Sequence, residues 1–275
     1  DGSEANSVEM PTLGAKNGLT LASMIGKDFD DPEWDTLLDQ LTYSEMVQTI
    51  TLGFHNTAAA ASIGKTATKD ENGPQGLTAA LTGGASAMCY TSEDVMAATF
   101  NVDLINEVGR CIGEDCLAMG YSGLYGPGIN MHRTAYCGRN FEYYSEDPFV
   151  AGTICAAEVQ GIQSKGVYVY LKHVALNDSE TSRRGVNTWL NEQTAREIYL
   201  EVADKAITDG GAWSVMTGFN RWGATWCGAN ANLLTGFLRG ELGMRGMCIT
   251  DFSGSSQYMD LVDGLIAGSD IWDLS

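Results

Sequence analysis

Short apolar, β-prone segments alternate with helical patterns along most of this chain. The apolar segments lie at residues 85–90, 122–127, 167–176, 212–219, 246–251 and 270–274. Helical patterns lie at 92–119, 193–209, 232–242 and 256–267. Because this order is typical of parallel strands joined by crossover helices, it predicts an α/β fold.

The length of the chain selects among the α/β folds. With 275 residues, 44% of them hydrophobic, the chain can bury a full core and falls within the range of one large domain. We therefore predict a closed (β/α)8 barrel of the TIM type, with an open doubly wound sheet as the second choice. The sequence stops directly after the last strand-like segment, so we expect the barrel to be incomplete at its C-terminus.

The first part of the chain differs from the rest. Residues 1–30 show no sustained periodicity, which predicts a linker or an N-terminal arm. The barrel domain is accordingly predicted to span residues 31–275.

Two helix starts follow this arm. Asp31 and Pro32 are residue types that favour the first turn of a helix. Thr42 and Glu45 have the spacing of a capping box, which predicts a second short helix that runs through Ile50.

The charge of the chain argues against two classes of partner. There are 35 acidic and 16 basic residues, which give a net charge of −19 at pH 7. An acidic surface repels nucleic acids and anionic lipids, so we expect neither nucleic acid nor a membrane as a partner. A neutral or cationic ligand is compatible with this charge.

The seven cysteines show no CxxC spacing, and no two of the three histidines are spaced as metal ligands. We therefore predict no metal site. An odd, scattered set of cysteines indicates reduced, buried thiols and favours a cytoplasmic location.

Three of the apolar segments end on side chains that can do chemistry. One brings Lys172 and His173, the next is followed by Asn220, and the segment MCIT ends on Asp251. The carboxyl ends of barrel strands meet at one mouth, so an ammonium, an imidazole and a carboxylate are expected to converge there. Each has a structural alternative: Asp251 could cap a helix or pair with Lys172, and His173 could be a hydrogen-bonded core residue.

The segment GRNFEYYSEDP (138–148) concentrates charge and aromatic rings. A forked guanidinium at Arg139 is suited to donate hydrogen bonds to sugar hydroxyls. Alternatively, Arg139 is held within its own loop by Glu142 or Glu146, and both interpretations can hold at once.

Trp222 and Trp226 follow the segment at 212–219. Their rings could stack on sugars at the mouth of a site. Packing beneath a loop explains them equally well, because buried tryptophan is common.

Several motifs together resemble the barrel domain of glycoside hydrolase family 3, the β-glucosidase-like enzymes. They occur in order between about Leu37 and Asp273: GPGINMHR, GRNFEYYSEDPFVAG, GIQSKGVYVYLKHVALNDSETSRR, REIYLEVADKAI, VMTGFN and LLTGFLRGELGMRGMCITDF. The Arg-Asn-Phe-Glu segment, the Lys-His pair and the final Asp-aromatic pair carry most of the specificity. The resemblance implies a (β/α)8 barrel that needs neither a metal nor a cofactor.

The resemblance also implies roles for matching positions. Asp251 stands at the position of the family's catalytic nucleophile. Lys172, His173 and Arg139 match residues that bind the sugar in subsite −1.

At three further substrate-binding positions the chain departs from the family pattern. Asn72 replaces the usual aspartate of an Asp-Gly-Pro turn, and it cannot accept charge-assisted hydrogen bonds, so sugar affinity or specificity is expected to differ. Phe219 replaces a tyrosine and lacks its hydroxyl. Phe252 replaces a tryptophan and keeps an apolar platform.

The activity implied by the resemblance is that of a retaining, exo-acting β-glycosidase. The first expectation is a β-glucosidase that acts on terminal β-D-glucosyl residues of a small β-glucoside or an oligosaccharide. Such an enzyme needs an ionised carboxylate about 5 to 5.5 Å from an acid. A rigid strand end would position Asp251 for this task.

The acid/base residue has no evident candidate in the chain. The resemblance implies a glutamate on a second, α/β sandwich domain, which 275 residues are too few to contain. The histidine loop of the N-acetylglucosaminidase branch has no counterpart in KHVALNDSE, and Glu142, Glu146 and Glu180 are interpreted as structural. The alternative function is therefore a sugar-binding module or pseudoenzyme that lacks the acid/base.

Overall fold

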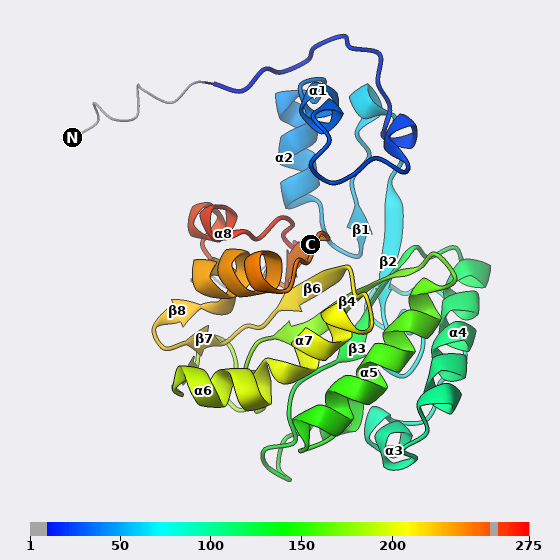
Figure 1. Cartoon of the computed structure of the whole chain (residues 1–275), viewed down its shortest axis with the longest axis vertical. Helices are drawn as coiled ribbons and strands as arrows, with labels where there is room; N and C mark the ends of the chain where they lie inside the picture. Colours follow the sequence, from blue (N-terminus) through cyan, green and yellow to red (C-terminus); the bar gives the residue numbers. More distant parts are fainter. Residues whose placement is uncertain (1–9, 254–257, 275) are drawn as a thin grey trace.

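A curled, mostly parallel sheet forms the centre of the protein in the computed structural model, which describes residues 10–253 and 258–274 (Figure 1). The strand order is β1-β2-β3-β4-β6-β9, with β1 antiparallel to β2 and the other neighbours parallel. The strands are β1 Asn56–Thr57, β2 Thr68–Asn72, β3 Gly123–Gly128, β4 Tyr168–Val174, β6 Ser214–Thr217 and β9 Cys248–Thr250. The predicted α/β class is confirmed.

The two edges of the sheet approach each other through the segment that follows the last helix. Ile271 forms a parallel bridge to Ile249 in β9. On the other side, Trp272 N donates to Ile50 O at 2.8 Å, and Gly53 N donates to Trp272 O at 3.2 Å. The strand predicted at 270–274 is thus an extended segment with a single bridge. Within the described residues this sheet has six strands, and the complete eight-stranded barrel stays a prediction.

Helices α4, α5 and α7 lie side by side along one side of the sheet (Figure 1). The α-helices are α1 Glu33–Leu38, α2 Tyr43–Thr51, α3 Glu93–Ala98, α4 Val102–Met119, α5 Pro148–Gln163, α6 Glu192–Thr194, α7 Glu201–Thr208 and α8 Leu261–Ala267. Two π-helical segments, η5 Ala195–Tyr199 and η7 Asn232–Glu241, continue the helices near α6 and before β9. Short 3-10 turns are η2 Leu21–Met24, η3 Ala61–Ile63, η4 Asn140–Glu142 and η6 Cys227–Ala229, and a small second sheet contains β5 Asn187–Thr188, β7 Arg221–Trp222 and β8 Thr225–Trp226.

Three of the predicted elements differ in the structure. The strand predicted at 85–90 is an exposed loop, and β2 supplies the sheet strand instead. The helix predicted at 92–119 is interrupted after α3, and the Asn101 side chain begins α4 by accepting a hydrogen bond from Leu104 N at 3.0 Å. The predicted helix at 256–267 begins at Leu261, and residues 254–257 lie outside the described residues.

Helix α5 was not predicted from the sequence. Ten of its sixteen residues are buried, since it packs between α4, α7 and the sheet. A helix buried on nearly all sides has no polar face, so the period of 3.6 residues that reveals surface helices is absent.

The N-terminal residues that the structure describes pack against the following elements. Met24 forms a small core with Leu37, Ala60 and Ile63. The capping box of Thr42 and Glu45 is confirmed at the start of α2. The domain boundary at residues 30 and 31 stays a prediction.

All seven cysteines are unpaired, as predicted, although Cys89 and Cys111 are exposed instead of buried. Across residues 10–253 and 258–274, no helix is both long and apolar enough to cross a membrane. The cytoplasmic location is not tested by these observations.

The closest packing in the helix layer depends on two glycines. A Cβ atom at Gly161 would lie 2.2 Å from Asn106 O, and one at Gly109 would lie 2.3 Å from Glu158 O. Both neighbours are backbone atoms, so α4 and α5 would have to separate to admit a methyl group.

We expect Gly161→Ala to lower the free energy of unfolding by about 2 kcal/mol, because the overpacking cost exceeds the gain in helix propensity. Urea denaturation measures this change. Gly138→Ala is the matched control, since no atom lies within 4 Å of its added Cβ. Equal stabilities of Gly161→Ala and Gly138→Ala would contradict the close helix contact.

Candidate active site

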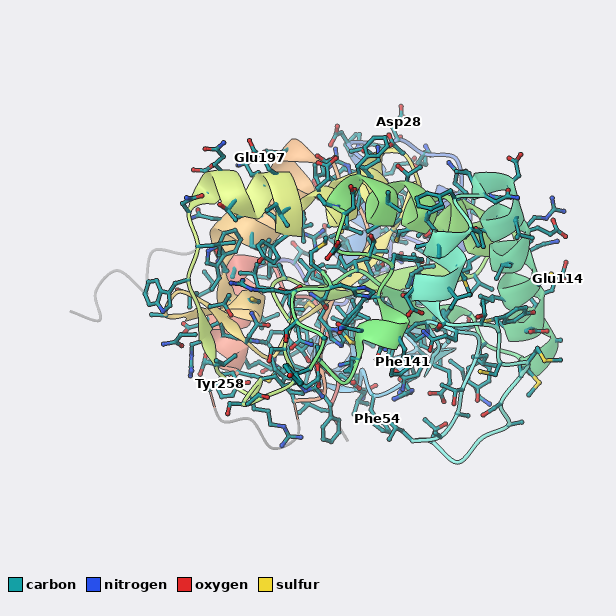
Figure 2. All side chains as sticks on the ribbon, turned by 90° about the horizontal axis from the view of Figure 1, so that it is seen from below. Asp28, Phe54, Glu114, Phe141, Glu197 and Tyr258 are labelled. Carbon is teal, nitrogen blue, oxygen red and sulfur yellow. The ribbon has the colours of Figure 1, made fainter. Side chains whose placement is uncertain are left out.

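A cavity of about 320 Å³ lies at the carboxyl ends of the strands. Its described lining residues are Phe54, His55, Asn72, Leu81, Tyr125, Arg139, Lys172, His173, Arg183, Arg184, Met216, Phe219, Asp251, Phe252 and Asp273. All seven residues predicted as catalytic or substrate-binding are among them. In Figure 2, Phe54 lies at the edge of the molecule opposite Glu197.

Successive strands deliver these side chains. Asn72 ends β2, Lys172 and His173 belong to β4, Phe219 follows β6, and Asp251 directly follows β9. The predicted convergence of an ammonium, an imidazole and a carboxylate is thus observed, while their roles stay predictions.

An irregularity in β4 explains why two consecutive residues line one cavity. In a regular strand Lys172 and His173 would point to opposite faces. The pairing of β4 with β6 shifts register between Lys172 and Val174. A bulge of this kind re-aims side chains, so both Lys172 and His173 reach the cavity.

One oxygen of Asp251 is held, while the other faces positive or polar groups. Phe252 N donates to Oδ1 at 2.8 Å. The Oδ2 atom lies 3.4 Å from His173 Nε2 and 3.5 Å from Arg183 Nη1, and it has no hydrogen-bond partner. The hydrogen bond to Oδ1 orients the carboxylate, and Oδ2 is enclosed beside His173 and Arg183.

Arg139, Glu142 and Lys172 form a buried charge cluster beside Asp251. Arg139 donates to Glu142 through Nε at 2.5 Å and through Nη2 at 3.0 Å. Lys172 Nζ lies 3.8 Å from Glu142 Oε2 and donates to Asn72 Oδ1 at 3.3 Å. Arg139 therefore fits both interpretations made from the sequence: Glu142 holds it, and it lines the cavity.

Burial and charge act in opposite directions on these groups. Burial alone would raise the pKa of Glu142, but Lys172 and Arg139 hold that pKa below its usual value. Burial lowers the pKa of Lys172, and the Glu142 carboxylate opposes this shift. The cluster thus keeps Glu142 as an anion that positions two cations.

His173 is a buried and neutral imidazole. Its Nδ1 atom lies 3.3 Å from both Asn130 Oδ1 and the Tyr143 hydroxyl. Burial, together with Arg139 and Lys172, lowers the pKa of His173 well below its usual value. Nε2 points toward Asp251, so the ring is both hydrogen-bonded in the core and exposed to the cavity.

Other functional candidates do not reach this cavity. Asn220, which follows β6, is buried and donates to Ala175 O at 2.9 Å, and it is not among the described lining residues of the cavity. Trp226 is buried, and its Nε1 donates to Gly218 O at 3.0 Å. Glu146 is not among the described lining residues of the cavity.

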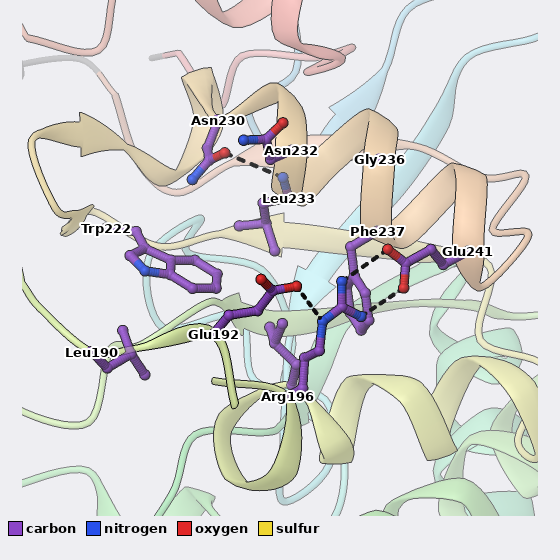
Figure 3. Close-up of a pocket in the computed structure, with 11 residues that line it drawn as sticks. Leu190, Glu192, Arg196, Trp222, Asn230, Asn232, Leu233, Gly236, Phe237 and Glu241 are labelled. Atoms are coloured by element: carbon purple, nitrogen blue, oxygen red, sulfur yellow. Dashed lines mark hydrogen bonds and ion pairs between the residues drawn. The ribbon is translucent and has the colours of Figure 1, made fainter. Parts of the chain in front are cut away.

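Trp222 lines a second cavity, of about 470 Å³, between η5 and η7. Figure 3 shows it across this cavity from the ion pair of Arg196 and Glu241, whose Nη1 and Oε2 atoms are 2.6 Å apart. Neither Trp222 nor Trp226 is among the described lining residues of the Asp251 cavity, and packing beneath a loop, the second interpretation made from the sequence, fits Trp226.

Arg183 and Asp273 are two of the eight described lining residues that were not recognised as site residues in the sequence. Arg183 was interpreted as part of the loop architecture. It does pair with Glu180 at 3.1 Å, but it also covers the Phe219 ring at 4.6 Å and approaches Asp251. Asp273 had the same signal as Asp251, namely an apolar segment that ends on a carboxylate.

The carboxyl group of Asp273 is buried, and one of its oxygens lacks a hydrogen-bond partner among the described residues. The residue is 4% exposed, and its Oδ1 atom has no hydrogen-bond partner. Burial raises the pKa of Asp273 to about 7; His55 and Lys172 oppose the shift, and Asp251 adds to it.

We expect Asp273→Asn to be more stable than the wild type above pH 7. An unfolded aspartate has a pKa of about 3.9. Between that value and about 7 the native state binds more protons than the unfolded state, so the stability of the wild type falls as pH rises through this window. The neutral amide of Asp273→Asn avoids this loss in the free energy of unfolding, which we expect to be about 1 to 3 kcal/mol.

Thermal and urea denaturation between pH 4 and pH 8 measure this difference. The stabilities of the two proteins should become more similar as the pH approaches 4, where Asp273 is protonated. Asp28→Asn, at an exposed position, is the control. A pH-independent difference between wild type and Asp273→Asn would contradict the enclosed carboxyl.

In the part of the chain that the structure describes, no group of three His, Cys, Asp or Glu side chains is placed to hold a metal ion.

Comparisons with known proteins agree with this geometry. The family profile described as the glycosyl hydrolase family 3 N terminal domain matches residues 53–265. Thermostable beta-glucosidase B of Acetivibrio thermocellus is 34% identical over 244 residues, which cover 86% of this chain and 32% of that protein. The chain spans about a third of the length of the curated relatives that it matches.

Solved structures are similar over most of the chain. Beta-glucosidase 3B from Thermotoga neapolitana, in complex with α-D-glucose, has a TM-score of 0.80 and 32% identity, covering 87% of this chain and 36% of that one. A beta-glucosidase from Paenibacillus barengoltzii has a TM-score of 0.85 at 26% identity, covering 97% of this chain and 31% of that one.

Proposed function

Since this chain belongs to glycosyl hydrolase family 3, we propose that it is the nucleophile-bearing domain of a retaining, exo-acting β-glycosidase. The observation that carries this proposal is the cavity in which Asp251 meets Lys172, His173 and Arg139 at the strand ends. The substrate that we propose is a terminal β-D-glucosyl residue of a small glucoside or an oligosaccharide. A solved relative that binds glucose supports this choice.

In the proposed reaction, an oxygen of the Asp251 carboxylate attacks the anomeric carbon of the sugar, and the bond to the leaving group breaks. The leaving-group oxygen takes a proton from a general acid, and a glycosyl-enzyme ester remains on Asp251. Water then attacks the same carbon, gives up a proton to the general base and restores the free carboxylate.

The geometry of Asp251 suits this attack. Its backbone N donates to Thr217 O at 3.2 Å, which ties it to the end of β6. Its Oδ1 atom accepts a hydrogen bond from Phe252 N, which holds the carboxylate in one orientation. A fixed nucleophile lowers the entropic cost of reaching the attack geometry.

Other lining residues would bind the sugar. Arg139 and Lys172 are charged donors for hydroxyl oxygens, and Asn72 adds an amide at the same end of the cavity. Phe219 and Phe252 supply apolar surfaces on which the C–H faces of a pyranose can pack.

The acid/base in our proposal comes from a second, α/β sandwich domain of the full-length protein. Glu142 is occupied by Arg139, and Glu180 by Arg183, so neither is free for proton transfer. The relatives, about three times as long as this chain, leave room for such a domain. We also propose that the curled sheet belongs to a (β/α)8 barrel.

The test is labelling with a 2-deoxy-2-fluoro-β-glucoside that carries a dinitrophenyl leaving group. Such a leaving group departs with little help from an acid, so the reagent tests the nucleophile in this chain alone. Intact-protein mass spectrometry should show one fluoroglucosyl unit, and peptide mapping should place it on Asp251.

Failure to label folded protein, while a known β-glucosidase is labelled alongside, would contradict the proposed chemistry. Glucose binding without labelling would favour the alternative, a sugar-binding module or pseudoenzyme that lacks the acid/base.

A further inference from the structure

Asp273 is the second carboxylate among the described lining residues of the cavity, and the proposed reaction does not use it. We infer that Asp273 binds the sugar in subsite −1 by accepting a hydrogen bond from one of its hydroxyl groups. The inference rests on the proposed function and deepens it, because it names a residue that selects the substrate.

Hydrogen bonds tie the backbone of Asp273 to residues on both sides of the proposed nucleophile, Asp251. Asp273 N donates to Thr250 Oγ1 at 3.0 Å. Its carbonyl oxygen accepts from Ser253 N at 2.9 Å and from Ser253 Oγ at 3.1 Å. Thr250 and Ser253 bracket Asp251 in the chain, so the two carboxylates are held in a fixed relation to each other.

One oxygen of the Asp273 carboxyl group could accept a hydrogen bond that no group of the described residues donates. A buried polar atom without a partner costs free energy, so native proteins rarely retain one without a reason. Oδ1 of Asp273 is such an atom, in a residue that is 4% exposed and lines the cavity. A ligand that donates a hydrogen bond there would remove this cost.

Neighbouring groups of the protein are already engaged. His55 Nδ1 lies 2.8 Å from Glu71 Oε1. Lys172 donates to Asn72 and faces Glu142. The occupant of the cavity is therefore a source of the donor that Asp273 Oδ1 lacks.

The chemistry of the cavity indicates the kind of occupant. Arg139, Lys172 and Arg183 are donors only, and they suit the oxygen lone pairs of hydroxyl groups. Asp273, when ionised, is an acceptor only, and it suits their protons. A hydroxyl group has both functions, so a neutral pyranoside fits this set of groups.

The experiment is a set of coupled binding measurements by calorimetry. The ligands are methyl β-D-glucopyranoside and its 2-, 3-, 4- and 6-deoxy analogues, and the proteins are the wild type, Asp273→Ala and Asp273→Asn. A hydrogen bond to a charged group corresponds to a change in affinity of about 10- to 100-fold. We expect Asp273→Ala to bind the parent glucoside more weakly by this factor.

The decisive result is coupling to a single hydroxyl. One deoxy analogue should bind the wild type as weakly as the parent binds Asp273→Ala, and it should bind Asp273→Ala no worse than the parent does. A purely structural role of Asp273 would weaken all five ligands equally. Asp263→Ala, at an exposed site in α8, should leave every affinity unchanged.

Asp273→Asn guards against misfolding, since the amide keeps the shape of the side chain. It should show the same coupling with a smaller loss, because the amide oxygen still accepts a hydrogen bond but without charge. Equal losses for all ligands, or an unchanged affinity for the parent, would overturn the inference. So would an absence of glucoside binding by the wild type.

The inference and the proposed function can fail separately. Labelling of Asp251 without any coupling at Asp273 would leave the glycosidase proposal intact and overturn the role of Asp273. Normal binding by Asp273→Ala, with turnover lost only for substrates that have poor leaving groups, would instead identify Asp273 as the acid and also overturn the inference.

Discussion

Replacing Asp251 by glycine is expected to lower kcat for a dinitrophenyl β-glucoside by about 10³-fold or more. The substitution removes the atom that would form the bond to the anomeric carbon. His173 and Arg183, which contact Asp251 Oδ2, offer no nucleophile in its place. Steady-state kinetics with the activated glucoside measures the loss, because this substrate depends little on the acid.

Azide gives this prediction a second readout. A small anion can enter the space left by the carboxylate, attack the anomeric carbon from the same side and expel dinitrophenolate. The product would be α-glucosyl azide, which nuclear magnetic resonance identifies. Asp251→Asn, which keeps the shape of the side chain, serves as the folding control. Retained activity in Asp251→Gly, or rescue that yields a β-azide, would contradict a nucleophilic role.

Replacing Arg139 by methionine is expected to lower the free energy of unfolding by about 3 kcal/mol at pH 7. Arg139 makes two hydrogen bonds to Glu142, whose side chain is 9% exposed. Without them, Glu142 is a buried anion whose remaining ion-pair partner is Lys172, at 3.8 Å. Leaving one member of a buried ion pair without its partner is costly, because the charge has lost its water as well.

The double substitution Arg139→Met with Glu142→Gln should recover most of this stability, because no uncompensated charge remains. The cost should also be smaller near pH 4. Arg139 holds the pKa of Glu142 below its usual value, so the stability from this pair is present above about pH 4.3 and is lost as the pH falls.

Urea denaturation of the single and double variants measures both effects. Arg110→Met is the surface control: its partner Glu107 is 3.7 Å away, and both side chains are at least half exposed. We expect a change below about 1 kcal/mol there. A double variant no more stable than Arg139→Met alone would contradict the role of Glu142.

Elements with a strong local signal could be predicted from the sequence. The capping box of Thr42 and Glu45 and the strand around Lys172 depend on neighbouring residues only, and both were found. Helix α5 was missed because other elements bury it on several sides. Its burial depends on segments that are far away in the chain. The loop at 85–90 was mistaken for a strand because its small apolar residues have no partner strand in the described structure.

The candidate site shows the same division. Strand ends and the family resemblance identified seven of the lining residues. Asp273 was missed, although its segment ends on a carboxylate as that of Asp251 does. Its position in the cavity depends on hydrogen bonds to Thr250 and Ser253, which the sequence does not show. Trp226 and Asn220 were chosen for their chemistry, and packing directs them away from the cavity.

The sequence by itself determined the α/β class, the family and the side chains that stand at the strand ends, because these depend on local patterns and short motifs. Only the tertiary structure decided which of these side chains meet. Lys172 and Asn72 are hydrogen-bonded although they are 100 residues apart in the chain. A bulge in β4 turns His173 into the same cavity, and the segment after α8 brings Asp273 beside the end of β9. Such contacts arise from the packing of distant segments, which no local pattern encodes.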